Sequence, residues 1–220
     1  MTEGRLPLPI VDAAELPRSL RAVLRPGDVL RDAGGRGRRL PRFFYEIDSW
    51  HTALELDVSE HFKLWEFIGV DVREAPEQRQ FPRYVPCAVT LLASQLEVFR
   101  EAVGTYVHIA ANGGYRSPLH RLTRGASTHC WGTAANIYRV GSDWLSTRDL
   151  IEKYAGIARR VSPGIWVRPY GASVGEADDH LHVDIGYAWL EPRDSAGVAV
   201  EAGEAVKAAE VKQDRTAVRQ

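Results

Sequence analysis

Hydrophobic residues recur along the chain with two different periods, and these periods predict its elements. Over residues 86–103 apolar side chains return every three or four positions, a proline suits the first turn, and Gly104 fits the position just past the end. A second helix is predicted to run from a cap at Ser146 or Thr147 to about Arg160. The two longest helices therefore lie in the middle and in the last third of the chain.

Shorter stretches, rich in β-branched and aromatic residues, predict strands. They cover residues 106–111, 133–140, 165–167 and 180–185. Helices precede and interrupt these strands without a regular strand–helix–strand repeat, which favours an α+β fold with a small antiparallel sheet flanked by helices. Farther upstream, Ser59 is a plausible cap for a short helix in which Phe62 and Glu66 lie one turn apart.

Changes in composition divide the chain into three parts. Residues 1–42 form a basic extension, since the stretch 17–42 holds eight arginines and two aspartates together with several glycines. Such a run is typical of a solvated arm, although clustered charge also suits a wall polymer, a nucleic acid or a protein partner. We expect the arm to be dispensable for folding. Residues 43–190 form the main domain, and residues 191–220 a flexible or weakly helical tail.

Composition excludes several classes of protein. Hydrophobic residues make up 45% and charged residues 26% of 220, so a globular chain is expected. Two cysteines cannot build a disulfide scaffold, and a net charge of −1 argues against a dedicated nucleic-acid binder. No apolar run is long enough to span a membrane. No basic start followed by an apolar stretch marks a secretory signal, so we expect a cytoplasmic protein as synthesised.

The strand at 180–185 carries the first chemical signal. Side chains alternate between the faces of a strand, so His180, His182 and Asp184 share one face while the intervening apolar residues face the core. Two histidines in this arrangement can both reach one metal, or one can bind metal while the other meets a substrate. A plain polar strand face is an equally good interpretation of this segment taken alone.

His129 strengthens the metal interpretation. A hydrolytic zinc site needs three protein ligands and one open position for water. His129 and His182 supply two ligands, and Asn136 stands where a third could reach across from the neighbouring strand. Asp179 is placed to act as the general base.

Three motifs together resemble a family of zinc peptidases. They are Gly-Tyr-Arg-Ser at 114–117, Ser-Thr-His-Cys-Trp-Gly-Thr-Ala-Ala-Asn at 127–136, and Asp-His-Leu-His at 179–182. Their order and spacing match the superfamily of D-Ala-D-Ala carboxypeptidases, D,D-dipeptidases, phage endolysins, lysostaphin-type enzymes and the hedgehog fold. The segment 59–67 also resembles the start of the phage-type members. The likeness covers about residues 58–190 and implies a hedgehog or D-Ala-D-Ala peptidase-like fold.

The resemblance implies a role for each matching residue. His129 and His182 would bind zinc, and Asn136 stands where the family has an aspartate ligand. The implied catalytic residues are Asp179 as acid and base, His180 beside the tetrahedral intermediate, and Arg116 at the scissile carbonyl or a substrate carboxylate. Ser127 and Tyr115, with Arg116, would shape the substrate pocket. Asp184 is either a group that orients a histidine or a ligand itself.

Asn136 departs from the family pattern. A carboxylate brings charge to zinc, whereas an amide brings one neutral oxygen, so zinc should bind more weakly. Three interpretations follow. Asn136 ligates through its oxygen, Asp184 replaces it as the third ligand, or the site has lost its metal.

Two functions are therefore expected. The first is a zinc-dependent peptidase, of D,D-carboxypeptidase or endopeptidase type, acting on peptidoglycan stem peptides or a D-amino-acid dipeptide. The alternative is a catalytically impaired binding or structural module on the same fold, for example within a phage-like particle. Phage-like release or delivery would bring a protein made in the cytoplasm to the cell wall.

Overall fold

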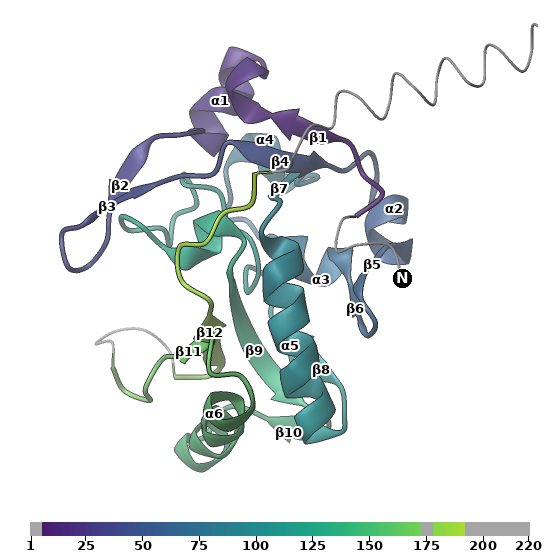
Figure 1. Ribbon diagram of the computed structural model, residues 1–220, viewed down its shortest axis with the longest axis vertical. Coiled ribbons are helices and arrows are strands. Elements are labelled where there is room, and N and C mark those ends of the chain that lie inside the picture. Colours follow the sequence, from purple (N-terminus) through teal and green to yellow (C-terminus); the bar gives the residue numbers. More distant parts are fainter. Residues whose placement is uncertain (1–5, 173–177, 192–220) are drawn as a thin grey trace, which may run out of the picture. The chain divides into compact units, whose positions relative to one another are not determined.

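The computed structural model describes residues 6–172 and 178–191 (Figure 1). The chain divides into two units, residues 1–190 and 191–220. The tail expected at 191–220 lies, apart from its first residue, outside the described residues. Within the first unit the protein is mixed α+β with small antiparallel sheets. None of the described helices combines the length and the apolar character that crossing a bilayer requires.

A five-stranded antiparallel sheet forms the second half of the unit. Its strands are β8 (Val107–Ile109), β9 (Ala134–Val140), β10 (Asp143–Trp144), β11 (Trp166–Val167) and β12 (Leu181–Asp184). Strand β9 is central. Its first half pairs with β12 and its second half with β8, while β10 folds back on its end and β11 pairs with the far edge of β12. The four predicted strand segments thus all belong to one sheet.

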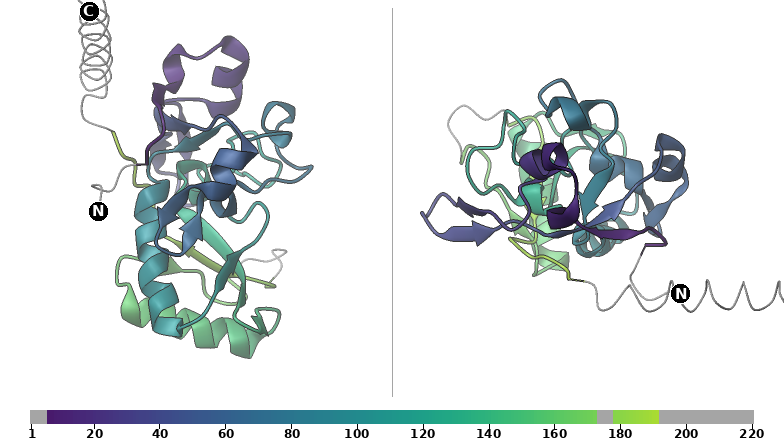
Figure 2. Two further views of the ribbon diagram at one scale, coloured as in Figure 1. Left: turned by 90° about the vertical axis from the view of Figure 1, so that its right-hand side faces the viewer. Right: turned by 90° about the horizontal axis from the view of Figure 1, so that it is seen from above.

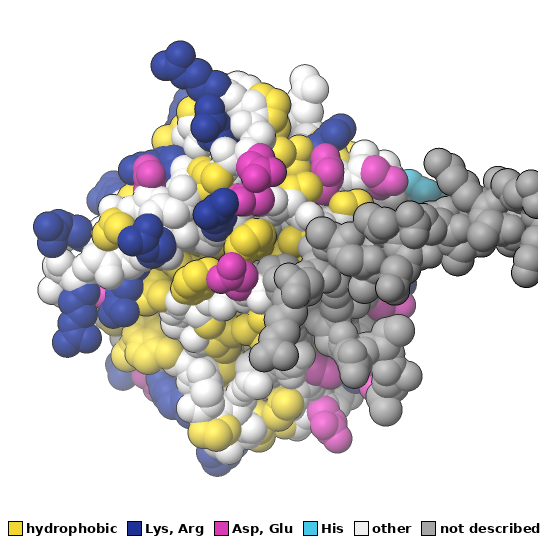
Figure 3. Space-filling view, turned by 45° about the horizontal axis from the view of Figure 1, so that its top comes forward, with side chains coloured by type: hydrophobic (Ala, Val, Ile, Leu, Met, Phe, Trp, Pro, Cys, Tyr) yellow, Lys and Arg dark blue, Asp and Glu magenta, His cyan; other side chains and the backbone are white. Residues whose placement is uncertain are grey.

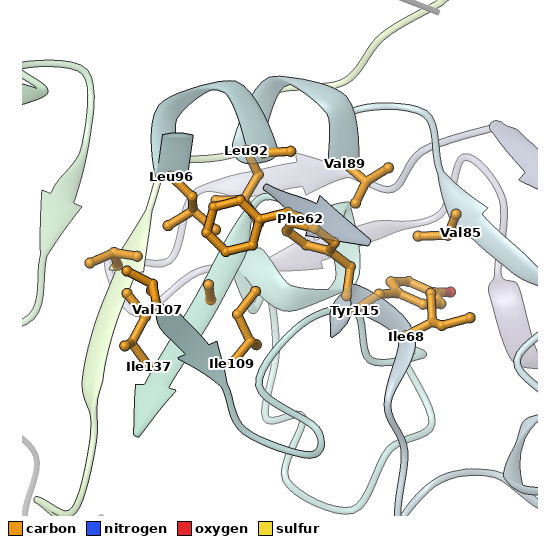
Figure 4. Packing of buried hydrophobic residues seen from close by; sticks show 14 of the residues in the cluster. Phe62, Ile68, Val85, Val89, Leu92, Leu96, Val107, Ile109, Tyr115 and Ile137 are labelled. Atoms are coloured by element: carbon orange, nitrogen blue, oxygen red, sulfur yellow. The ribbon is translucent and has the colours of Figure 1, made fainter. Parts of the chain in front are cut away.

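Helices α5 (Val89–Val103) and α6 (Arg148–Val161) pack on each other and on this sheet (Figures 1 and 2). Leu92 and Leu96 of α5 face Val107 and Ile137 of the sheet in the core (Figure 4). The helix ends as the sequence predicts, because Gly104 takes a left-handed conformation (φ 64°) and its N–H caps the last carbonyls.

The first half of the unit is built on smaller pieces. A three-stranded sheet contains β1 (Ile10–Asp12), β4 (Phe43–Glu46) and β7 (Tyr84–Pro86). Two hairpins are β2 (Val29–Arg31) with β3 (Gly37–Arg39), and β5 (Asp57–Ser59) with β6 (Phe62–Lys63). The helices of this half are η1 (Ala13–Glu15), α1 (Arg18–Leu24), α2 (Trp50–Glu55), α3 (Leu64–Ile68) and α4 (Pro76–Arg79), and a further short helix, η2 (Thr128–Trp131), precedes β9.

The basic segment is not a solvated arm in the structure. Strand β1 pairs with β4, and Leu6 and Leu24 are 5% and 1% exposed within the main core. The indole of Trp131 also donates to the carbonyl of Arg39 at 3.0 Å. The arginines lie on the surface of this packed segment, and Figure 3 shows Lys and Arg side chains gathered over the β2–β3 hairpin. The boundary expected at residue 42 is therefore corrected: residues 6–42 belong to the same core as the rest.

Two other local expectations differ from the structure. Ser59 does not cap a helix but ends strand β5, because its hydroxyl donates to Glu97 on α5 at 2.8 Å. The short helix begins at Leu64 instead, where the Glu66 carboxylate accepts from the N–H of Lys63 at 2.9 Å. Pro86 likewise belongs to β7, three residues before α5 starts.

Candidate functional site

The polar residues of β9 and β12 meet on the face of the sheet away from α5. His182 lies directly opposite Asn136 in the antiparallel register. The His182 ring has one nitrogen at each of two oxygens: Nδ1 is 2.9 Å from Asn136 Oδ1, and Nε2 is 3.0 Å from Asp184 Oδ2. The neighbours Leu181 and Val183 are buried in the core. The alternation predicted for this strand is confirmed over 181–184.

The two oxygens around His182 create a mismatch. A neutral imidazole has one N–H donor and one lone pair, and both neighbours accept hydrogen bonds as they are placed. The carboxylate of Asp184 is the stronger acceptor, so the proton belongs on Nε2. The Nδ1 lone pair and Asn136 Oδ1 then face each other across 2.9 Å. A cation that both atoms bind would resolve this contact, as would a rotated amide.

His129 approaches the same place from η2. Its Nδ1–H donates to the carbonyl of Gly114 at 2.8 Å, which leaves Nε2 with a lone pair. The centroids of the His129 and His182 rings are 5.2 Å apart, within the roughly 6 Å that two ligands of one zinc ion allow. Burial, helped by the positive charge of Arg116, holds the pKa of His129 well below its usual range. The ring is therefore neutral, as a metal ligand must be.

A close backbone approach fixes the acceptor for His129. The N–H of Tyr115 donates to the carbonyl of Phe67 at 2.7 Å, which draws the loop against α3. A Cβ on Gly114 would lie 2.2 Å from that same carbonyl oxygen, so only glycine fits there. The Gly114 carbonyl is thereby held where it meets His129.

These donors suit a zinc ion. His129 Nε2, His182 Nδ1 and Asn136 Oδ1 are the available atoms, and each histidine has its other nitrogen held by an acceptor, the arrangement that orients metal-binding imidazoles. Among the described residues, no three His, Cys, Asp or Glu side chains group closely enough to hold a metal. The oxygen that lies next to His182 Nδ1 is that of the Asn136 amide, 2.9 Å away, while Asp184 lies at the other nitrogen of the ring.

Asp179 and His180 form a separate pair beside these residues. His180 Nδ1 is 2.7 Å from Asp179 Oδ1, and the guanidinium of Arg168 lies 3.2 Å from His180 Nε2. Burial lowers the pKa of His180, so the neutral ring donates to Asp179 and accepts from Arg168. Asp179 itself is two-thirds exposed. Both nitrogens of His180 are thus engaged, and its predicted contact with a tetrahedral intermediate would require Arg168 to move.

Arg116 lies beside His129 and is 9% exposed. Its backbone N–H donates to the carbonyl of His129, and its Nε donates to the carbonyl of Asn112. Ser127, half-buried, precedes η2 and accepts from the N–H of Cys130 through its carbonyl. The structure therefore places Arg116 at the site and Ser127 at its border.

The substrate-binding role expected for Tyr115 is corrected. Its side chain is 2% exposed and packs edge-on against Phe44, with ring centroids 6.4 Å apart. Figure 4 shows it beside Ile68 in the core. The ring faces inward because the neighbouring Arg116 takes the position at the site.

Two buried residues that the motifs do not include hold this loop. The carboxylate of Glu74 accepts from the N–H and the hydroxyl of Ser117. Asn112 takes a left-handed conformation (φ 56°), and its Oδ1 lies 3.0 Å from His120 Nε2. The turn sequence Asn-Gly-Gly signals the second residue, whereas Glu74 lies too far along the chain for any local pattern to reveal it.

Comparison of the chain with protein-family models, curated proteins and solved structures gave no match.

Proposed function

We propose that this protein is a zinc-dependent peptidase, of D,D-carboxypeptidase or endopeptidase type, that cleaves peptidoglycan stem peptides on a hedgehog or D-Ala-D-Ala peptidase-like fold. The observation that carries the proposal is that the His129 and His182 rings lie 5.2 Å apart, with Asn136 Oδ1 2.9 Å from His182 Nδ1 and with the other nitrogen of each histidine at a hydrogen-bond acceptor. The three motifs, matching in order and spacing, support the substrate class.

A bound zinc ion would supply a Lewis acid that polarises an amide carbonyl and acidifies water. The chain supplies the rest. Asp184 keeps the proton of His182 on Nε2, so that Nδ1 stays free to bind. Asp179 holds an exposed carboxylate that can take a proton from water and pass it to the leaving amine. His180 donates to that carboxylate and orients it.

Arg116 fits a substrate carboxylate or carbonyl. Its guanidinium is fixed by a bond from Nε to the Asn112 carbonyl, and a planar, always charged fork suits both acceptors. Burial beside His129 strengthens its electrostatic effect on a bound substrate.

A second function, a binding module on the same fold, is favoured by one specific observation. Asn136 stands where the family has a charged ligand, so the zinc ion would be held by neutral donors alone. Such a module would bind a peptide at the same residues, for instance in a phage-like particle, without turning substrate over.

Hydrolysis distinguishes the two functions. We expect purified protein to contain zinc and to release D-Ala or shorter stem peptides from peptidoglycan fragments. His129→Ala should abolish both properties, whereas His51→Ala, at an exposed histidine on α2 outside the site, should keep both. Zinc binding without any cleavage would support the binding module, and a His129→Ala variant that still cleaves would overturn the site.

A further inference from the structure

A β-bulge changes the outer face of the sheet next to Asn136. On β8 the partners of His108 and Ile109 are Arg139 and Ile137, so Tyr138 is an extra residue in β9. A bulge lets two consecutive side chains leave on one side of a sheet. Tyr138 and Arg139 both contact His108, while Ile137 and Val140 on either side are buried. The bulge thus adds an aromatic ring and a guanidinium to the face that carries Asn136.

These side chains complete a row of rings. The centroids step from Tyr106 to His108 by 6.2 Å, to Tyr138 by 6.0 Å and to Trp144 by 5.4 Å. Arg139 holds the row, since its guanidinium lies 5.3 Å from the Trp144 ring centroid and 2.9 Å from His108 Nε2. Burial and the Arg139 charge lower the pKa of His108, so its neutral Nε2 can accept this hydrogen bond. We call these four rings with Arg139 the aromatic strip.

A cavity of about 400 Å³ opens beside the aromatic strip, and His108 and Tyr138 belong to both. Trp65 and Glu66 of α3 form one wall, His108 and Tyr138 another, and residues 109–111 take part in the lining. The N–H of Ala110, in this lining, donates to the backbone carbonyl of Asn136 at 2.9 Å, so the cavity lies one backbone pairing away from the proposed zinc ligand.

The outer rings of this surface are open to solvent. Tyr106 is 71%, Trp144 57% and Trp65 43% exposed. An ordered, contiguous aromatic surface of this kind is typical of a binding site. Its rings have flat faces for apolar C–H groups, and Arg139, His108 and Glu66 offer hydrogen-bonding groups at the edges. That combination suits a sugar chain, whose rings present C–H faces and hydroxyl edges.

We propose that the aromatic strip and its cavity bind the glycan chain of the substrate, a β-1,4-linked N-acetylhexosamine polymer, while a stem peptide lies at the zinc site. The inference deepens the proposed function and rests on it for the identity of the sugar. Nucleic acid is a poorer occupant, because the two cations at the strip, Arg100 and Arg139, each lie over one of its rings, and the cavity beside it is lined by the acidic residue Glu66. An extended peptide would need free strand edges rather than ring faces.

A titration with a defined sugar tests the strip without catalysis. The probe is the four-residue β-1,4 N-acetylglucosamine chain, added to the full-length protein and followed by ligand-observed NMR. We expect saturable binding, at least tenfold weaker in Tyr106→Ala and in Trp144→Ala. Trp144→Phe, which keeps a ring, should retain most of it. Trp50→Ala, at an exposed tryptophan on α2, should bind as the wild type does, and thermal melts should show each variant folded.

The outcomes separate this inference from the proposed function. Sugar binding that is lost in the ring variants supports the strip, whether or not zinc binds and peptides are cleaved. Zinc binding and cleavage without any sugar binding would overturn the strip and leave the peptidase intact. Equal sugar binding in wild type and both alanine variants would also overturn it. So would a result in which the alanine variants lose binding of a sugar-free stem peptide but keep binding of the sugar.

Discussion

The two faces of the five-stranded sheet are made from the same strands, but one packs in the core and the other carries the polar residues of the candidate site. On the inner face Ala135, Ile137 and Leu181 are fully buried against the helices. On the outer face Asn136 contacts one nitrogen of His182, and Asp184 contacts the other. Because successive side chains of a strand point to opposite faces, neighbouring residues belong either to the buried core or to the candidate site.

The alternation between the two faces ends at the β-bulge in β9. Up to Ile137 the residues alternate strictly, and after it the bulge sends Tyr138 and Arg139 to the outer face together. We infer that substitutions on the inner face change the free energy of unfolding, whereas those on the outer face change binding. The predictions below test that division, beginning with the largest expected effect.

Removing residues 1–42 should be the most damaging change. The deletion takes away strand β1 and the buried Leu6 and Leu24, which share one core with the sheet's inner face. Each buried leucine contributes about 1.5–3 kcal/mol, so we expect loss of several kcal/mol or of cooperative unfolding. Urea unfolding measures this. The control, Arg36→Gln with Arg39→Gln, changes only exposed charges of the same segment and should unfold as the wild type does. An unchanged urea midpoint for the truncated protein would show that the segment adds nothing to the core.

The inner face itself is tested by neighbouring residues of β9. Ile137→Ala should lower the free energy of unfolding by about 2–5 kcal/mol, because a fully buried side chain leaves a cavity. Tyr138→Ala, one residue along and half-buried on the outer face, should cost about 1 kcal/mol or less. Chemical denaturation of both variants makes the comparison, and similar losses would mean that the two faces are not separate.

The buried histidine of η2, His129, predicts a dependence on pH. In the metal-free protein the pKa of His129 lies well below its usual value near 6.5, so below that pH the unfolded chain binds the proton first. Stability should be intact above about pH 6.5 and fall by up to about 1.4 kcal/mol per unit as the pH drops toward the folded-state pKa. Unfolding with chelator at pH 7, 6 and 5 tests this, and His129→Gln should flatten the slope. Parallel slopes in both proteins would contradict the assignment.

Asp184 should matter for metal affinity more than for folding. Its carboxylate holds the Nε2–H of His182, and loss of such a partner weakens metal binding by about 10–100-fold. We expect that loss in Asp184→Ala and a smaller one in Asp184→Asn, which keeps an acceptor oxygen. Zinc titration against a competing chelator measures both. Full affinity in Asp184→Ala would mean that His182 is oriented by something else.

The regular parts of the fold follow from local patterns. The period of residues 89–103 and the glycine after it specify α5, and alternation along 181–184 specifies which side chains of β12 face the core. The register of β9 and β12 places Asn136 opposite His182, and the ring of His129, from η2, lies 5.2 Å from that of His182. These features depend on residues close in sequence or on a single strand pairing.

The remaining features depend on contacts between distant residues. The basic segment has few large apolar residues, yet its Leu24 is buried in the core. Strand β1, which precedes it, pairs with β4. Ser59 has a cap-like sequence but gives its hydroxyl to Glu97, 38 residues away. Tyr115 turns inward because of the core around Phe44. No local pattern contains these partners, and the bulge at Tyr138 is equally a property of the pair of strands.

Zinc titration of three proteins tests the central claim most directly. Wild type should bind one zinc ion per chain, and Asn136→Asp should bind it more tightly, because a charged oxygen replaces a neutral one beside His182 Nδ1. His182→Ala should bind none, since two donors cannot hold a catalytic zinc ion. Equal affinity of wild type and Asn136→Asp would contradict the placement of Asn136 at the metal. Zinc binding that persists in His182→Ala, or is absent from both wild type and Asn136→Asp, would contradict the site as a whole.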